Sequence, residues 1–270
     1  MKNKANLWIV ICVLTFLTGC QSDSNYRNSS VVDYLYPKSN SQEVSVEIPK
    51  LMLPLKIGIA FTPSGYTTHG ALNENKKTEL MNAISGHFKS YEFVKSITVI
   101  PSDYLRPQGS FDNLDQLKRL FDIDVIALVS YDQTNYTDAG FASIAYWTIL
   151  GAYIIPAEKN STHTMLDAVL YDIGSRKMLF RAPGRSSVLS NSTLVGLEKQ
   201  TREDAVTGFE QASENLVGNL KVELELFRDR VKQSPEEYTI VKAQGYSGSG
   251  SSHWIMMLIA CAIAVRHFRQ

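Results

Sequence analysis

The middle of the chain alternates between two hydrophobic periodicities, and this limits the available folds more than any other feature. Segments with the two-residue period of a strand alternate with segments of helical period, in the order 55–61, 73–89, 93–100, 112–121 and 124–131. The last of these carries Val125 to Val129 without a polar break, as a central strand covered on both faces does. The order β-α-β-α-β predicts a partly parallel sheet.

Two more strands and a long helix are predicted in the second half. Residues 162–173 and 177–182 have strand character and are joined by Gly174-Ser175, which favours an antiparallel hairpin. Apolar side chains at steps of three and four over residues 206–231 predict one amphipathic helix of about thirty residues that ends before Pro235. The expected fold is α/β, with α+β left open, and its order is β-α-β-α-β-β-β-α.

These patterns divide the chain into five parts. A globular domain is expected over residues 51–235, because 44% of the chain is hydrophobic and this is enough for a core. Four segments flank this domain. They are a signal peptide (1–19), a polar tether (20–50), a linker containing glycine and serine (236–253) and a hydrophobic C-terminal tail (254–270).

Charge and cysteine content exclude several classes of function. The 27 lysines and arginines balance 27 aspartates and glutamates, so no basic field exists to attract nucleic acid. The three cysteines, Cys12, Cys20 and Cys261, all lie outside residues 51–235. A disulfide or a cysteine-ligated metal is therefore not expected in the folded domain.

The N-terminus has the layout of an export signal. Lys2 and Lys4 precede an apolar stretch at 7–17, and small residues precede Cys20. The stretch would form about 16 Å of helix, against about 30 Å for the hydrocarbon core of a bilayer. A permanent membrane span is the weaker interpretation.

The sequence Leu-Thr-Gly-Cys at 17–20 resembles the lipobox of bacterial lipoproteins. The resemblance implies cleavage between Gly19 and Cys20 by lipoprotein maturation enzymes, and acylation of Cys20 on its sulfur and its new amino group. Several acyl chains would then hold the protein to a membrane. Gln21 in place of aspartate implies sorting to the outer membrane in that family. The alternative is an ordinary secretory signal that contains a cysteine.

The C-terminal tail is also short for a membrane span. Residues 254–265 are apolar and cover about 18 Å as a helix, and Arg266 and Arg269 follow directly. The positive-inside rule places these arginines in the cytoplasm, with the apolar segment transiently in the inner membrane. The preceding glycines and serines disfavour helix.

This layout resembles the GlyGly-CTERM sorting tail that rhombosortases recognise and, together with the lipobox, the rhombotail lipoprotein family. The resemblance implies a rhombosortase as a partner and cleavage in the region of Gly245, Gly248, Ser249, Gly250 and Ser251. The glycines are not adjacent as in the usual tail, so the cut site stays open within residues 245–252. A plain C-terminal anchor and a docked terminal helix are the alternatives.

The sequence carries no strong catalytic motif. The five histidines show no metal-ligand spacing, and no GxSxG or phosphate-binding loop is present. No cofactor, metal site or catalytic residue is predicted. Asp122 and Asp124 flank a strand entry, where such residues are more often caps or turn positions than functional carboxylates.

The most unusual internal segment is residues 139–155, which carry no formal charge. It is interpreted either as buried core or as an exposed flap for oligomerisation or membrane contact. The aromatic residues of such a contact flap are Phe141, Tyr146, Trp147 and Tyr153.

The favoured hypothesis is a non-enzymatic binding or assembly module of the cell envelope, lipid-anchored through Cys20. The alternatives are a pore or assembly lipoprotein similar to curli-secretion proteins, and a hydrolase whose active-site residues are dispersed in the sequence. Periplasmic and surface-facing orientations, and the oligomeric state, are left open.

Overall fold

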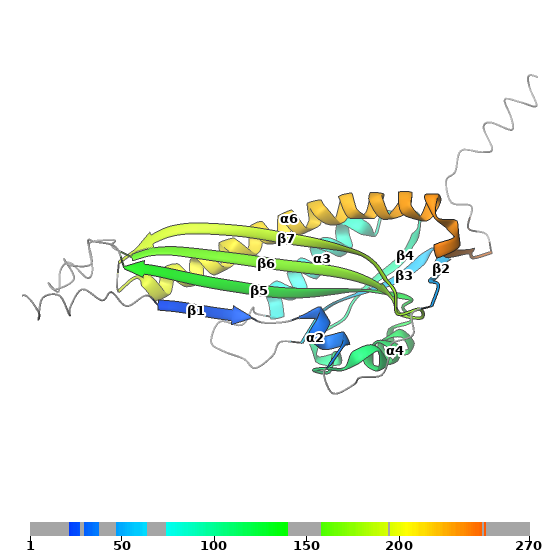
Figure 1. The fold of residues 1–270 in the computed structure, drawn as a ribbon, viewed down its shortest axis with the longest axis horizontal. Helices are drawn as coiled ribbons and strands as arrows, with labels where there is room; N and C mark the ends of the chain where they lie inside the picture. The colour runs from blue at the N-terminus through cyan, green and yellow to red at the C-terminus, as the bar shows by residue number, and fades with distance from the viewer. Residues whose placement is uncertain are drawn as a thin grey trace, which may run out of the picture.

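The computed structural model describes residues 22–27, 30–37, 47–63, 74–139, 158–193, 195–244 and 246. Its main sheet has the strand order β4-β3-β5-β6-β7, with β1 pairing with β5 beside this path, and α-helices cover both faces (Figure 1). The predicted α/β class is confirmed. The predicted order of elements also holds, in the bounds β3 (Leu55–Phe61), α3 (Glu74–Phe88), β4 (Val94–Val99), α4 (Ser110–Phe121), β5 (Val125–Ala139), β6 (Glu158–Asp172), β7 (Met178–Ser192) and α6 (Leu197–Gln233).

The sheet is parallel at one end and antiparallel at the other. β3 pairs in parallel with β4 and with residues 125–129 of β5. β5, β6 and β7 are each 15 residues long and antiparallel, so they continue well past the end of β3. We call this continuation the outer ribbon (residues 130–139, 158–167 and 183–192) and the rest of the sheet its inner half.

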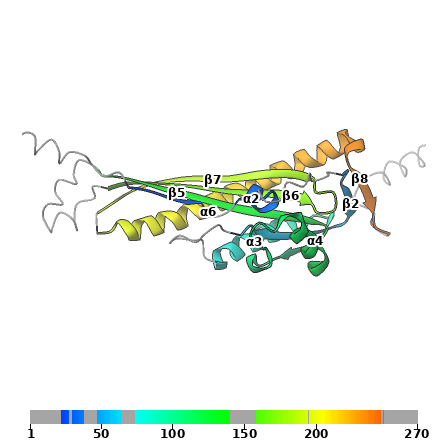
Figure 2. The ribbon, with the colours of Figure 1, turned by 60° about the horizontal axis from the view of Figure 1, so that its bottom comes forward.

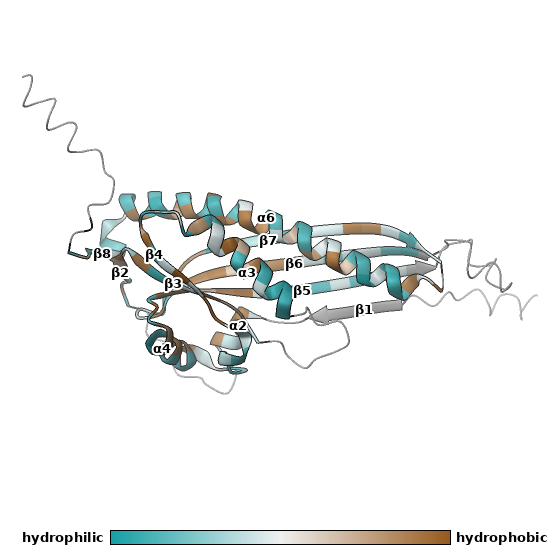
Figure 3. Ribbon diagram, turned by 180° about the vertical axis from the view of Figure 1, so that it is seen from behind, coloured by the Kyte–Doolittle hydropathy of each residue, from teal (hydrophilic) through white to brown (hydrophobic). Residues whose placement is uncertain are grey.

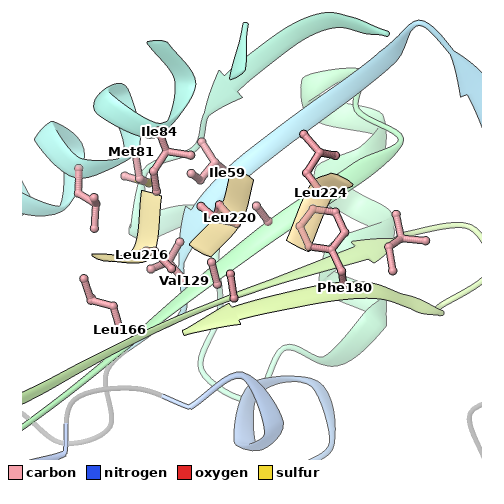
Figure 4. Packing of buried hydrophobic residues seen from close by; sticks show 14 of the residues in the cluster. Ile59, Met81, Ile84, Val129, Leu166, Phe180, Leu216, Leu220 and Leu224 are labelled. Atoms are coloured by element: carbon pink, nitrogen blue, oxygen red, sulfur yellow. The ribbon is translucent and has the colours of Figure 1, made fainter. Parts of the chain in front are cut away.

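Alternating side chains of β5 serve two separate cores in the inner half. Val125 and Val129 face α3 and α6, whereas Ile126 and Leu128 face α4 and the short helix α2 (Val31–Leu35). Figure 4 shows the first core, in which residues of α3 and α6 meet the sheet. The side chains labelled there are Ile59, Met81, Ile84, Val129, Leu166, Phe180, Leu216, Leu220 and Leu224. Hydrophobic residues are concentrated in this half, and polar ones in the outer ribbon (Figure 3).

Helix α6 runs along the whole sheet, from the outer ribbon to the inner half (Figures 1 and 2). Its 37 residues form a helix about 55 Å long. It ends at Ser234, followed by Pro235, which begins a 3₁₀ turn (Pro235–Glu237). No helix in the described ranges is both long and apolar enough to cross a membrane.

The structure differs from the expected tether and linker. Residues 22–27 form β1 (Ser22–Arg27), which pairs antiparallel with residues 132–137 of β5 where β3 has ended. Tyr34 and Leu35 of α2 are buried in the second core. β2 (Lys50–Leu53) and β8 (Thr239–Lys242) pair in parallel as a second small sheet. Segments expected to be irregular are therefore part of the fold.

Smaller differences concern lengths and caps. β5 extends to Ala139 rather than 131, because its polar second half is held by backbone pairing with both β1 and β6. α4 begins at Ser110, two residues before the predicted 112, and its N-cap is Gly109. α6 begins at Leu197, nine residues before the predicted 206, because its first turns pack on the polar outer ribbon through Asp204, which accepts a hydrogen bond from Ser190.

Candidate functional site

A cavity of about 590 Å³ lies at the inner end of the molecule, between the C-terminal half of α6, the sheet and the β2–β8 pair. Its floor includes the buried side chains of Leu179, Leu224 and Phe227. Leu55 and Phe93 also line it and are only half-buried. A volume of this size is within the range of sites for small molecules, which are mostly apolar.

The charged residues that line the cavity are exposed and therefore form its rim. They comprise three cations, Arg228, Lys232 and Lys242, and one carboxylate, Glu92. Arg228 pairs with Glu225 at 2.8 Å and Lys232 with Asp229 at 3.0 Å. Among the residues that line the cavity, cations therefore outnumber carboxylates, and the carboxylates that pair with Arg228 and Lys232 stand outside the lining.

The outer ribbon meets α6 through a polar interface rather than a hydrophobic one. The amide of Gln133, which is 3% exposed, donates to Thr164 Oγ1 at 2.8 Å and to the Ala205 carbonyl at 3.1 Å. The Ser190 hydroxyl donates to Asp204, which also accepts from Gln200 Nε2 at 2.9 Å. Such bonds compensate the desolvation of buried polar groups.

Two amide oxygens in this interface have no partner in the described residues. They are Oδ1 of Asn135 and of Asn160, and both side chains are buried. Asn160 still donates through Nδ2 to Ser192 Oγ at 3.0 Å. In the described part of this interface, the buried amide donors named above are therefore hydrogen-bonded, whereas two amide oxygens lack a donor.

The opposite face of the outer ribbon bears a shallow hollow of about 510 Å³ that includes His163, Thr134, Arg185 and Ser187. The Nε2 atom of His163 lies 3.0 Å from Ser161 Oγ, two residues away on β6. A nucleophilic triad contains a serine–histidine pair of this kind, together with a carboxylate that hydrogen-bonds to the histidine. Within the described ranges, no carboxylate hydrogen-bonds to His163, and no group of three acidic, histidine or cysteine side chains is arranged to hold a metal ion.

The two aspartates at the strand entry have structural contacts. Asp122 is the C-cap of α4, with φ of 52°, and both its carboxylate oxygens lie 2.7 Å from Lys56 Nζ. The hydrogen bond from Lys56 holds the pKa of Asp122 below its usual value of 3.8. Asp124 lies 3.8 Å from Lys118. Both residues tie the turn before β5 to its neighbours.

The predicted site residues lie outside the described residues. They are Gly19, Cys20, Phe141, Tyr146, Trp147, Tyr153, Gly245, Gly248, Ser249, Gly250, Ser251, Arg266 and Arg269. Their described neighbours can be placed. Ser22 pairs with Thr137 and Ala139 with Glu158, all at the outer end of the ribbon, whereas Tyr246 lines the cavity at the inner end.

The cavity could not be predicted from the sequence, because the residues that line it come from segments far apart in the chain. β2 and β8 fall in the stretches expected to be a tether and a linker. The apolar residues of Lys50–Leu53, together with half-buried aromatics near Phe93, are the signal that could have indicated it. The charges of the rim are spread over β8, α6 and the turn before β4.

Comparisons with known proteins give no family. No protein-family model matches the chain, and no curated protein matches it. Three solved structures are similar to parts of it. A dodecamer of a PelC variant from Paraburkholderia phytofirmans is 8% identical, covering 73% of this chain and 98% of that one, with a TM-score of 0.32.

The other two are a putative neuraminyllactose-binding hemagglutinin homolog from Helicobacter pylori and the lipoprotein GNA1162 from Neisseria meningitidis. The first is 11% identical and covers 77% of this chain and all (100%) of that one, with a TM-score of 0.34. The second is 15% identical and covers 56% and 98%, with a TM-score of 0.25. All these TM-scores are below 0.5, so the likenesses carry no argument about function.

Proposed function

We propose that the chain is an exported envelope lipoprotein, acylated at Cys20, that works without catalysis as a binding or assembly module. The observation that carries the proposal is the position of Ser22, which pairs with Thr137 at the outer end of the ribbon. Cys20 precedes Ser22 by two residues, so acyl chains on Cys20 would hold this end of the body at the membrane. The lipobox and Gln21 favour the outer membrane.

The segment 139–155 supports a second membrane contact at the same end. Its flanking residues Ala139 and Glu158 are cross-strand partners at the end of β5 and β6. The segment carries no formal charge and includes Tyr146 and Trp147, residue types that favour the membrane–water interface. We therefore propose that it is a membrane-contacting flap beside the lipid anchor.

The described chain ends at the other end of the body. Tyr246, the last described residue, lines the cavity near β8. We propose that a rhombosortase cuts the chain within residues 245–252 and that Arg266 and Arg269 stop the tail at the cytoplasmic face before cleavage.

One observation favours a second candidate function. Ser161 and His163 are within hydrogen-bonding distance, as a hydrolase would need. If the protein hydrolyses esters, both Ser161→Ala and His163→Ala abolish the activity, and Val222→Ala, at an exposed position on α6 away from the hollow, retains it. Hydrolysis of a panel of p-nitrophenyl esters by the purified protein measures this. Equal rates for all four proteins would remove the hydrolase from consideration.

Intact mass spectrometry of protein from its native envelope tests the main proposal. We expect a mature chain that starts at Cys20, carries acyl groups and ends within residues 245–252. Cys20→Ala should abolish acylation, whereas Cys12→Ala, in the segment removed with the signal, should leave the mature mass unchanged. An unacylated chain in the unaltered protein would refute lipid anchoring, and a product that retains Arg269 would refute tail cleavage.

Tryptophan fluorescence tests the flap separately. The three tryptophans are Trp8 in the signal peptide, Trp147 in the segment and Trp254 in the tail, so Trp147 is the reporter in a chain that has lost both ends. Trp254→Phe leaves the same reporter in a chain that keeps the tail. Reconstitution into vesicles that contain brominated phospholipid should quench this fluorescence. Emission that is unaffected by brominated lipid would place Trp147 in the core instead.

A further inference from the structure

We propose that the apolar cavity at the inner end binds one long-chain fatty acid, with the hydrocarbon chain inside and the carboxylate among Arg228, Lys232 and Lys242. This inference goes beyond the proposed function and does not depend on acylation of Cys20. It rests on the lining of the cavity, the charge of its rim and the placement of the chain's own hydrophobic segments.

The lining favours hydrocarbon over a polar ligand. Leu55, Ile57 and Phe93 face the cavity and are only half-buried, although the surrounding core is tightly closed. Exposed apolar surface in a concave site is covered favourably by an apolar ligand, at roughly 25 cal/mol for each Å² removed from water. Leu224 and Phe227 close the floor from α6.

The rim favours an anionic head group. Lys242 makes no ion pair with another described residue. Arg228 and Lys232 pair with exposed carboxylates three residues earlier on the same helix, at Glu225 and Asp229, and Arg228 also lies over the ring of Phe93 at 5.9 Å. Exposed pairs of this kind are weak, so both cations can accept a second anion. Glu225 and Asp229 offset the charge of Arg228 and Lys232 in the empty cavity, so the anionic head group would compete with these two exposed carboxylates and bind Lys242 directly.

The chain's own hydrophobic groups fit the site less well. The tail after Tyr246 contains two arginines and no acidic side chain, so it supplies no carboxylate side chain for the cations of the rim. The acyl groups expected on Cys20 would be attached two residues before Ser22, which pairs at the other end of the sheet. Val125 lines the cavity and Thr137 pairs with Ser22, and these positions are about 40 Å apart along β5. A separate amphiphile is therefore the occupant.

Photoaffinity labelling in vesicles tests this proposal on the full mature chain. The probe is an 18-carbon fatty acid with a diazirine in its hydrocarbon chain, and the labelled positions are mapped by mass spectrometry. We expect labelling of the peptides that contain Phe93 and Phe227. Oleate should compete for this labelling, and oleyl alcohol, which lacks the charge, should compete at least tenfold less well.

Variants separate the two parts of the site. Lys242→Gln should weaken competition by oleate about tenfold, while Lys221→Gln on the exposed face of α6 should not change it. Val231→Trp narrows the cavity and should reduce labelling without loss of the folded state, which circular dichroism monitors. If Val231→Trp unfolds the chain, Leu55→Phe serves the same purpose.

Three outcomes would overturn the proposal. They are labelling confined to peptides outside the cavity, equal competition by oleate and oleyl alcohol, and equal weakening by Lys242→Gln and Lys221→Gln. Labelling in the cavity that is lost by competition with a peptide of residues 254–270 but not with oleate would assign the site to the tail instead.

Discussion

Gly208 on α6 lies directly against Thr164 on β6, so close that a Cβ at position 208 would be 2.6 Å from Thr164 Oγ1. The glycine lets the helix approach the polar outer ribbon, and its own carbonyl accepts a hydrogen bond from Ser186 at 2.6 Å. Gly218, ten residues later, faces open space. Two glycines in one helix thus have different structural roles.

Alanine at these positions should have opposite effects. Gly208→Ala is expected to lower the free energy of unfolding by about 1–3 kcal/mol, because Thr164 or the helix must shift. Gly218→Ala should raise it by up to about 1 kcal/mol through better helix propensity. Urea unfolding followed by circular dichroism measures both. Equal effects of the two substitutions would mean that α6 does not pack on β6 as described.

The buried amide of Gln133 should contribute to stability through its two hydrogen bonds. Gln133→Ala leaves Thr164 and the Ala205 carbonyl without this donor, at an expected cost of about 1–3 kcal/mol. Thr134→Ala, on the other face of the same strand, should cost less than about 0.5 kcal/mol. Chemical denaturation of the two variants measures both free energies of unfolding. A cost for Thr134→Ala as large as for Gln133→Ala would contradict the assignment of the buried face.

The segment before β2 should behave as core rather than as a tether. Leu35 is 1% exposed and Val32 is 65% exposed, although both belong to α2. Leu35→Ala is expected to cost about 2–5 kcal/mol, and Val32→Ala about 0.5 kcal/mol or less. Thermal unfolding of the two variants is the measurement. A free tether would show no cost in either case.

The Lys56–Asp122 pair should give a pH dependence on the acidic side. Because Lys56 lowers the pKa of Asp122 in the folded state, ionised Asp122 stabilises the fold above the unfolded pKa of 3.8. This contribution is lost as the pH falls through the lower folded pKa.

Carboxyl-carbon NMR titration should find the pKa of Asp122 below 3.8 and closer to that value in Lys56→Gln. In unfolding experiments, the difference between the unaltered protein and Asp122→Asn should be present at neutral pH and decline below about pH 4. Asp103→Asn serves as a control at an exposed carboxylate. A pKa for Asp122 that is the same with and without Lys56 would show that the pair does not form in solution.

The inner half of the fold was predictable because its elements bury aliphatic side chains. The unbroken run from Val125 to Val129 and the helical spacing of Leu114 and Leu117 identify a strand and a helix without tertiary information. The turn at Gly174-Ser175 was predicted in the same way. Each of these signals depends on residues that are close in sequence.

The outer ribbon was not predictable by the same means. Residues 131–139 of β5 carry Gln133 and Asn135 toward α6, where hydrogen bonds replace apolar burial. β1 contributes backbone pairing with β5, which has no hydrophobic signature. The cavity combines residues near 53, 93, 228 and 242, whose approach depends on the completed fold.

The placement of the two chain ends has a mechanical consequence. The peptide enters the body beside Ser22 and leaves it beside Tyr246, at opposite poles separated by roughly the 55 Å length of α6. If Cys20 and the tail both hold the protein to one bilayer, as we propose, the long axis of the body lies along the membrane surface. Cleavage of the tail would then leave the protein attached at the Ser22 end alone and allow the end near Tyr246 to point away from the lipid.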